Sequence, residues 1–402
     1  MSNPPSVPSA TPPAVARAQA LLRSCVHCGF CNATCPTYAL TGDEREGPRG
    51  RLHLMEAVFA GHADLDVAPL DHCLTCRSCE STCPAGVRYG DILAIAREHA
   101  HTSRGALARA LDTLLETSVG ARGPIQALAR TAQRVRPLLP RGLKRRVRPR
   151  ERALVWPTAR HATRVGLLLG CVQPALAPDI DLKAAIVLDH LGISAVALAS
   201  GCCGALPYHL HASAKGRAQA RATLARDDAA YAGLTTTATG CTAFLRDYPH
   251  LFADSEEARA AERFSARVQD IGAWIDPLLL TPVAPRMRRR LAWHAPCSLQ
   301  HGLRDANRIA AVLEALGHTL VPVDEPSLCC GSAGAYSLRY PRWGRRLGER
   351  KWRALTLSAP QEVVTANIGC LQHLAARADR PVRHWIELVY EALTNPGRDA
   401  RD

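Results

Sequence analysis

The sequence predicts an α+β multidomain protein in which a helical N-terminal domain precedes two repeated α/β domains. In the first quarter of the chain, apolar residues recur at helical spacing around two identical cysteine runs, at 25–36 and 73–84. In the rest, short apolar runs typical of buried strands alternate with helical patterns, and a Cys-Cys-Gly tripeptide occurs in each half, at 202–204 and 329–331. The chain has 402 residues, 47% of them hydrophobic, which is enough for about two to four domains.

The two cysteine runs share the spacing Cys-x2-Cys-x2-Cys-x3-Cys-Pro. This is the ligand spacing of bacterial 4Fe-4S ferredoxins, in which three cysteines wrap one cube and the fourth binds the other cube. We therefore predict two 4Fe-4S clusters with exchanged fourth ligands. The first cluster is assigned to Cys25, Cys28, Cys31 and Cys83. The second cluster is assigned to Cys73, Cys76, Cys79 and Cys35.

Two other uses of these eight cysteines are disfavoured. Structural zinc sites usually take separated Cys-x2-Cys pairs, not a triple followed by x3-Cys-Pro. Disulfides form in oxidising compartments, whereas residues 1–13 lack the basic and apolar segments of a secretory signal. We therefore expect a cytoplasmic protein whose thiolates bind metal.

The helical domain is expected over residues 21–110, as a ferredoxin-type domain with two 4Fe-4S clusters. Between the runs, Leu52, Met55 and Val58 share one helical face, and a second helical pattern begins at Tyr89. Residues 1–20 are expected to form a disordered tail and residues 111–160 a basic helical connector.

The two cysteine-rich domains are expected over residues 161–285 and 286–395. The strands predicted for the first are 164–170, 193–199 and 235–239. The strands predicted for the second are 290–294, 318–323 and 363–367. Strands alternating with helices predict parallel sheets, and the cysteines follow strand ends, where α/β folds build their sites.

The remaining eight cysteines divide evenly between the two repeats. The first set is Cys171, Cys202, Cys203 and Cys241, and the second set is Cys297, Cys329, Cys330 and Cys370. Equivalent placement favours cofactor binding, as a further iron-sulfur site, either an unusual cluster or one between domains. Buried structural or regulatory thiols are the alternative, because free cysteine is among the most buried residue types. Five histidines lie nearby in sequence, and each alone is more typical of a surface or capping position than of a ligand: His209, His211, His294, His301 and His373.

The formal net charge is +14, with a basic tract over residues 134–152. This tract predicts docking to an acidic partner, contact with anionic lipid, or a solvated linker. No aromatic or recognition-helix pattern accompanies it, so we expect no nucleic-acid partner. No run of about 18 apolar residues predicts a membrane span, so any membrane contact is expected to be peripheral, on the cytoplasmic face of the inner membrane.

Arg45, Arg49 and Arg51 are expected close to the first cluster, in a plain loop or in a role that tunes its reduction potential.

With its doubled ferredoxin run and two Cys-Cys-Gly repeats, the chain resembles the iron-sulfur subunits of bacterial glycolate oxidase, from about residue 21 to 395. The segments that carry the resemblance are 25–38, 42–51, 71–80, 201–205, 328–334 and 365–370. The resemblance implies an electron-transfer subunit of a glycolate dehydrogenase complex. Its FAD-bearing partner subunits oxidise glycolate to glyoxylate, and it passes the electrons toward the respiratory chain. The substrate site is then expected on a partner, and no catalytic residue is assigned to this chain.

Other functions remain open at this point. The runner-up is the corresponding subunit of an anaerobic glycerol-3-phosphate or lactate dehydrogenase. A thiol-based redox regulator and a thiol-disulfide enzyme that use the paired cysteines are further alternatives. The repeat of heterodisulfide-reductase subunits ends in Cys-x-x-Cys. This chain differs, because Phe244 and His373 stand where the final cysteine of that motif would be, three residues after Cys241 and Cys370. A non-cubane cluster is therefore not carried over directly.

Overall fold

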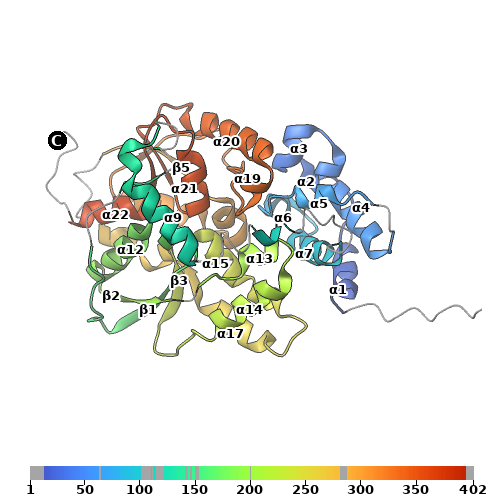
Figure 1. The fold of residues 1–402 in the computed structure, drawn as a ribbon, viewed down its shortest axis with the longest axis horizontal. Helices are drawn as coiled ribbons and strands as arrows, with labels where there is room; N and C mark the ends of the chain where they lie inside the picture. The colour runs from blue at the N-terminus through green and yellow to red at the C-terminus, as the bar shows by residue number, and fades with distance from the viewer. Residues whose placement is uncertain are drawn as a thin grey trace, which may run out of the picture.

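The computed structural model describes residues 13–62, 65–100, 110, 112–114, 122–140, 144, 147–149, 154–199, 201–280 and 288–394. A helical N-terminal domain lies at one end of the molecule, against a larger body that contains both sheets (Figure 1). The described chain thus consists of a helical domain followed by two repeats of an α/β unit, as predicted.

The N-terminal domain is built from short helices around one apolar core. Its elements are α1 (Pro13–Leu22), α2 (Phe30–Ala33), α3 (Pro36–Thr41), η1 (Glu44–Glu46), α4 (Pro48–Phe59), α5 (Ala68–Asp71), α6 (Ser78–Thr82) and α7 (Tyr89–Ala100). Met55 of α4 and Ile92 and Leu93 of α7 are almost fully buried in this core. The helical spacing of these apolar residues therefore decides how α4 packs on α7.

The expected disordered tail is wrong for residues 13–20, which form most of α1. Val15, Ala18 and Leu22 lie on one face of this helix and are buried against α4 and α7. Pro13 occupies the first helical position, where its missing N–H costs nothing. The Pro-rich composition therefore marks the start of a helix here. Residues 1–12 lie outside the described residues.

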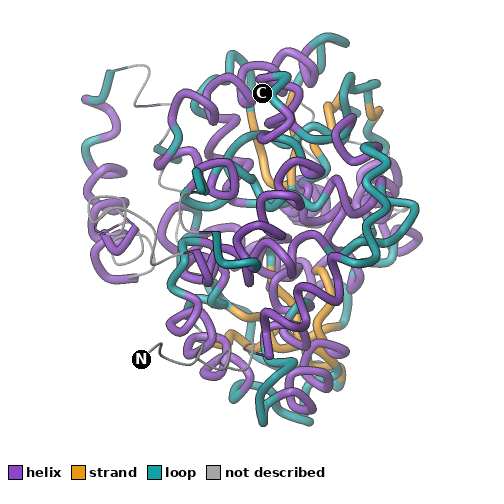
Figure 2. Tube along the Cα trace, turned by 90° about the vertical axis from the view of Figure 1, so that its right-hand side faces the viewer, coloured by secondary structure: helices purple, strands orange, loops and turns teal. Residues whose placement is uncertain are grey.

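Each repeat contains a four-stranded parallel sheet, with the strand order β2-β1-β3-β4 in the first and β6-β5-β7-β8 in the second. The first repeat comprises β1 (Thr163–Leu168), α11 (Gln173–Leu176), α12 (Pro178–His190), β2 (Ile193–Leu198), α13 (Ala205–His209), α14 (Ser213–Leu224), β3 (Gly233–Thr236), α15 (Thr239–Arg246), α16 (Tyr248–Leu251), α17 (Ala258–Arg267), β4 (Val268–Asp270) and η4 (Ile271–Trp274). The second comprises β5 (Arg290–His294), the π-helical turn η6 (Ser298–Leu303), α18 (Ala306–Ala315), β6 (Thr319–Leu320), α19 (Tyr336–Arg339), α20 (Pro341–Thr356), β7 (Glu362–Thr365), α21 (Ile368–Ala375), β8 (Val382–His384) and α22 (Trp385–Thr394). Figure 2 shows the two groups of strands in separate parts of the molecule, with helices around them.

Several predicted strands end earlier than expected, two of them by three residues. The strand expected over residues 318–323 pairs only at Thr319 and Leu320, and Pro322, which has no N–H to donate, follows closely. The strand expected to reach Thr239 ends at Thr236, because Thr239 already begins α15.

The two repeats share one apolar core. Ile180 and Leu188 of α12, from the first repeat, belong to the same buried cluster as Leu313 of α18 and Trp385 of α22, from the second. A buried ionic group joins the same helices, because Lys183 and Arg148 both contact Glu387. The two repeats are therefore packed as one body.

His384 of β8 also links the repeats, and it predicts a loss of stability in mild acid. It is fully buried, its Nε2 donates to the carbonyl oxygen of Thr237 at 3.0 Å, and its Nδ1 accepts from the Ile386 N–H. Burial lowers the pKa of His384 to about 4, below the value of about 6.5 in an unfolded chain. The unfolded chain therefore binds the proton first, so this contribution to stability is complete above about pH 6.5 and is lost as the pH falls toward 4.

We expect thermal unfolding of the wild-type chain to respond more steeply to acid than that of His384→Gln, whose amide can keep the bond to Thr237. Between pH 7.5 and 5.5 the extra loss should be about 1 kcal/mol. His62→Gln, at an exposed histidine, is the matched control and should follow the wild type. Equal pH dependence in wild type and His384→Gln would contradict the assignment.

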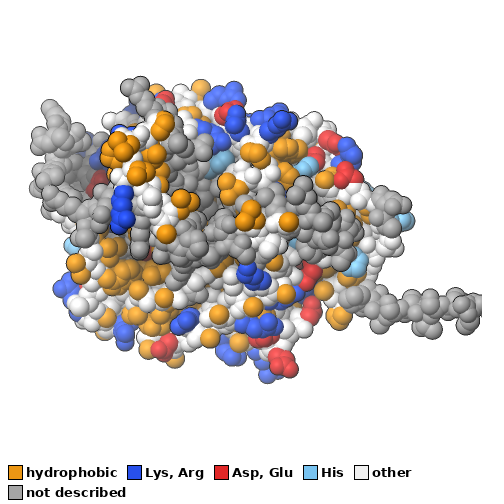
Figure 3. Space-filling view, viewed as in Figure 1, with side chains coloured by type: hydrophobic (Ala, Val, Ile, Leu, Met, Phe, Trp, Pro, Cys, Tyr) orange, Lys and Arg blue, Asp and Glu red, His pale blue; other side chains and the backbone are white. Residues whose placement is uncertain are grey.

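The described part of the basic connector contains α9 (Arg122–Arg134) and η3 (Arg136–Leu138). Of the basic tract, Arg141, Arg145, Arg146, Arg150 and Arg152 lie outside the described residues. On the face shown in Figure 3, the Lys and Arg side chains that are drawn are spread over the surface with Asp and Glu side chains among them. Across the described ranges, every helix is too short or too polar to cross a bilayer.

Candidate metal centres

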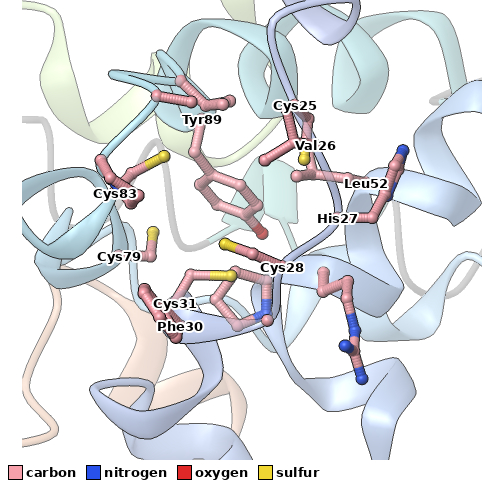
Figure 4. Close-up of a pocket in the computed structure, with 16 residues that line it drawn as sticks. Cys25, Val26, His27, Cys28, Phe30, Cys31, Leu52, Cys79, Cys83 and Tyr89 are labelled. Carbon is pink, nitrogen blue, oxygen red and sulfur yellow. The ribbon is translucent and has the colours of Figure 1, made fainter.

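Five cysteines of the N-terminal domain line one hollow between α2, α4 and α7. They are the four assigned to the first cluster, Cys25, Cys28, Cys31 and Cys83, together with Cys79. Figure 4 shows their sulfur atoms around a common space, with Tyr89 and Leu52 beside them. Burial and the neighbouring Cys25 thiol raise the pKa of Cys31 to about 11. A bound cation would reverse this shift, because metal ions bind thiolates and displace the protons.

The four cysteines assigned to the second cluster line a second hollow. They are Cys35, Cys73, Cys76 and Cys79. A backbone donor already approaches one of these sulfurs, because the Thr75 N–H lies 3.4 Å from Cys73 Sγ. The hydroxyl oxygen of Thr37, which donates to Glu46 O, lies 3.2 Å from Cys35 Sγ. Burial raises the pKa values of Cys76 and Cys79 well above that of an ordinary thiol. A convergent set of four thiols with hydrogen-bond donors around it fits the ligand shell of a 4Fe-4S cube.

The two loops that carry the triples bend in the same way. His27 and Thr75, each two residues after the first cysteine of a run, have φ angles of 51° and 52°. Gly29 and Arg77, each four residues after it, have φ angles of 83° and 63°. These left-handed positions curl each loop so that its cysteines face inward. All sixteen cysteines of the chain are free thiols, so no disulfide competes for the ligands.

Arg51 lies at the second hollow, so its expected position beside the first cluster is wrong. Its side chain is 1% exposed, and its guanidinium lies 3.8 Å from Cys35 Sγ, donates to Pro69 O at 2.7 Å and pairs with Glu46 at 2.8 Å. Burial opposes its charge, but the acidic groups around it raise the pKa of Arg51 above its ordinary value. Arg49 lines the first hollow and pairs with Glu44, whereas Arg45 pairs with Asp43 at the surface.

The N-terminal domain is fastened to both repeats by charged and polar contacts. Arg77 pairs with Asp247 at 2.7 Å, and Glu98 pairs with Arg217 at 2.7 Å, both in the first repeat. Toward the second repeat, Arg339 pairs with Asp71 at 3.2 Å. These contacts hold the loop of the second cysteine run against the cysteine-rich body.

The first cysteine set gathers at the carboxyl ends of β1, β2 and β3. Hydrogen bonds from the Cys171 and Cys203 thiols lower the pKa of Cys202 to about 3, and the Gly204 N–H lies 3.4 Å from Cys202 Sγ. Gly204 has a φ angle of 95°, and a Cβ at this position would lie 2.4 Å from the carbonyl oxygen of Gly216 in α14. The glycine of Cys-Cys-Gly therefore lets the cysteine loop lie against the following helix.

The second cysteine set gathers at the equivalent edge of the second sheet. Cys330 Sγ lies 3.1 Å from Cys370 Sγ, and the Gly331 N–H lies 3.5 Å from Cys329 Sγ. Cys297 and Cys76 of the N-terminal domain, both partly buried, pack against one apolar cluster that contains Cys329. The second set therefore lies near a thiol of the second hollow.

The five histidines named from the sequence have different surroundings. His209 packs edge-on against Phe244, His211 pairs with Asp71, His301 Nδ1 lies 2.9 Å from Ser81 Oγ, and His373 Nε2 lies 3.0 Å from Gly344 O. His294 differs, because one of its ring nitrogens lies within 4.8 Å of the thiols of Cys330 and Cys370. In the sequence, His294 stands at the end of a strand and three residues before Cys297. This position could have marked it as a ligand, but spacing along the chain does not distinguish it from the other four histidines. The buried Lys351 beside the second set has no such signal in the sequence.

Comparison with known proteins assigns the same parts of the chain. The 4Fe-4S dicluster domain family matches residues 21–87, and the cysteine-rich domain family matches residues 165–246 and 291–375. The chain is 42% identical over 388 residues to the glycolate oxidase iron-sulfur subunit of Escherichia coli (strain K12), which covers 94% of this chain and 95% of that protein. It is 28% identical over 400 residues to the probable glycolate oxidase iron-sulfur subunit of Bacillus subtilis (strain 168), with 89% of each chain covered. It is also 27% identical over 244 residues to lactate utilization protein A of Exiguobacterium sp. (strain ATCC BAA-1283 / AT1b), which covers 57% of this chain and 98% of that protein.

Proposed function

The chain belongs to the glycolate oxidase iron-sulfur subunit family, and we propose that it takes electrons from a flavin-bearing partner that oxidises glycolate to glyoxylate. Its own role is electron transfer by iron-sulfur clusters. The observation that carries the proposal is the continuity of the thiol-lined sites: both hollows of the N-terminal domain share Cys79 and Tyr89 in their walls, and Cys76 adjoins the second cysteine set.

The proposed ligands of the clusters are the two groups of cysteines that line the hollows. Cys25, Cys28, Cys31 and Cys83 would hold the first cluster, and Cys73, Cys76, Cys79 and Cys35 the second. When bound, such clusters supply reversible one-electron transfer, which a flavin converts to the two-electron oxidation of a substrate. Leu52 and Tyr89 form part of the wall of the first hollow, and the N–H and guanidinium donors around Cys73 and Cys35 stabilise thiolate charge in the second.

The substrate site and the FAD belong to partner subunits in this proposal. The proposal assigns no residue of this chain to substrate chemistry, so the partner would distinguish glycolate from a related hydroxy acid. The corresponding role with a lactate-oxidising partner is the second candidate, because lactate utilization protein A matches more than half of the chain. A cytoplasmic position with peripheral contact at the inner membrane is part of the proposal, and the basic tract over residues 134–152 is what supports it.

Co-purification tests the proposed function. The tagged full chain, isolated without air from cells that express its natural partners, should carry a flavoprotein, and glycolate should bleach the iron-sulfur absorbance of the complex. Lactate and glycerol-3-phosphate are the comparison substrates. A complex that is reduced by lactate and not by glycolate supports the second candidate, and a purified chain without flavin that no substrate reduces would overturn both.

A further inference from the structure

The two cysteine sets occupy equivalent places in the repeats but have different surroundings. The last residue of the central strand is Leu168 in the first repeat and His294 in the second, each three residues before the first cysteine of its set. Leu168 packs in an apolar cluster with Cys203. His294 is 1% exposed and faces Cys330 and Cys370. Only the second set of the described chain therefore has an imidazole at this position.

Neither ring nitrogen of His294 has a hydrogen-bond partner within the ranges that the structure describes. A buried imidazole normally gives its N–H to a carbonyl or carboxylate, as His384 does with Thr237. The groups near His294 are instead two thiols. One ring nitrogen of His294 and the sulfur atoms of Cys330 and Cys370 all lie within 4.8 Å of one another. Imidazole nitrogen and thiolate sulfur are the ligands that zinc and iron take together in proteins.

A buried cation also adjoins the second set. Lys351 of α20 is fully buried, and its Nζ donates to the carbonyl oxygens of Glu325 at 2.8 Å and Pro326 at 3.1 Å. Burial lowers the pKa of Lys351 to about 8, and the neighbouring Cys330, Cys329 and Cys370 oppose that shift. Burying an ammonium group is costly unless negative charge lies nearby, so a buried lysine at this position fits a site where metal-bound sulfurs carry negative charge.

The first repeat lacks this cation. Gly204 lies close to Gly216 of α14, and Gly331 lies close to Gly344 of α20 in the same way. These equivalent contacts show which positions of α14 and α20 correspond between the two repeats. Seven residues further on, Thr223 stands in α14 where Lys351 stands in α20. Thr223 is buried and donates to the carbonyl oxygen of Gln219 within its own helix. The second repeat thus differs from the first by two buried groups, a metal-ligand side chain and a positive charge.

We propose that the second cysteine-rich domain binds a thiophilic transition metal, with His294 as a nitrogen ligand beside the thiolates of Cys330 and Cys370. Ligand sulfurs on one tetrahedral metal are about 3.8 Å apart, given metal–sulfur bonds of about 2.3 Å, and the present separation of 3.1 Å is close to that value. Zinc and iron share this ligand chemistry. Iron here would adjoin the second cluster through Cys76, whereas zinc would serve structure alone. The inference does not depend on which substrate a partner oxidises.

Metal analysis of the full chain, purified without air, tests this inference. We expect metal beyond the about eight irons of the two ferredoxin-type clusters. His294→Leu, which installs the residue of the first repeat, should lose that additional metal and keep the rest. His373→Gln is the matched control, since His373 already bonds to Gly344 O, and it should keep the wild-type metal content. An unchanged metal content in His294→Leu, or no metal beyond eight irons in the wild type, would overturn the proposal.

Spectroscopy identifies the ligand and distinguishes the two metals. With ¹⁵N-labelled histidine, pulsed EPR of an iron centre should show a nitrogen coupling that His294→Leu abolishes, and X-ray absorption of a zinc centre should show mixed nitrogen and sulfur ligands. If His294→Leu fails to fold, His294→Cys provides a thiolate in its place. It should retain metal and lose the nitrogen signal, and retention of the nitrogen signal would refute His294 as the ligand.

Discussion

Cys83→Ser should remove the same cluster as Cys25→Ser, although these two cysteines belong to different runs. Cys83 lines the hollow of Cys25, Cys28 and Cys31 and not the second hollow, whereas Cys73 and Cys76 of its own run line only the second and Cys79 lines both. A serine hydroxyl is a poor substitute for a thiolate, so each single variant should lose about four of the about eight ferredoxin-type irons. Iron and sulfide analysis of anaerobically purified protein measures this loss.

Paired substitutions identify the exchange of ligands directly. The double variant Cys25→Ser/Cys83→Ser should lose no more iron than either single variant, because both changes affect one cluster. Cys73→Ser/Cys83→Ser should lose about eight irons, because it affects both clusters. Ser24→Ala, at an exposed neighbour of Cys25, is the control and should keep all of them. The reverse pattern in the two double variants would show that each run completes its own cluster.

Arg51→Met should strongly destabilise the N-terminal domain. The substitution keeps an apolar stem but removes the donors to Pro69 O and Thr37, and it leaves the Glu46 carboxylate buried with His72 as its hydrogen-bond partner. Removing one partner of a buried ion pair costs about 3–5 kcal/mol. Denaturant unfolding of the holo-protein without air should show a loss of this size. Arg45→Met removes an exposed pair with Asp43 and should leave unfolding nearly unchanged.

The same variant should lower the reduction potential of one cluster only. A positive charge beside a cluster favours the reduced, more negative form, and Arg51 lies 3.8 Å from the sulfur of Cys35 in the second hollow. If Arg51→Met does not fold, Arg51→Met/Glu46→Gln removes the buried charge pair together and permits the titration. A potential that stays the same for both clusters would reject a tuning role. A shift confined to the first cluster would show that the guanidinium acts elsewhere.

The parts of the structure that depend on local spacing were predictable from the sequence. The intervals between cysteines dictate which thiols one loop can turn inward, so the cysteines assigned to each cluster line one hollow together, with Cys79 lining both. The strands around Val165, Leu291 and Val363 were also predictable, because apolar runs of this length are typical of buried parallel strands.

The remaining features depend on contacts between distant segments. α1 lies in a Pro-rich stretch whose composition masks the apolar stripe of Val15, Ala18 and Leu22. The position of Arg51 follows from the fold of α4 over α5, which the loop sequence does not specify. His294 was distinguishable from four other histidines only after β5 and α21 placed it against Cys330 and Cys370.

The core shared by α12, α18 and α22 has a consequence for how the chain unfolds. Because both repeats contribute to one buried apolar cluster, neither can separate from the other without exposing that cluster to water. The two repeats should therefore lose their structure together, in one cooperative transition, rather than one after the other.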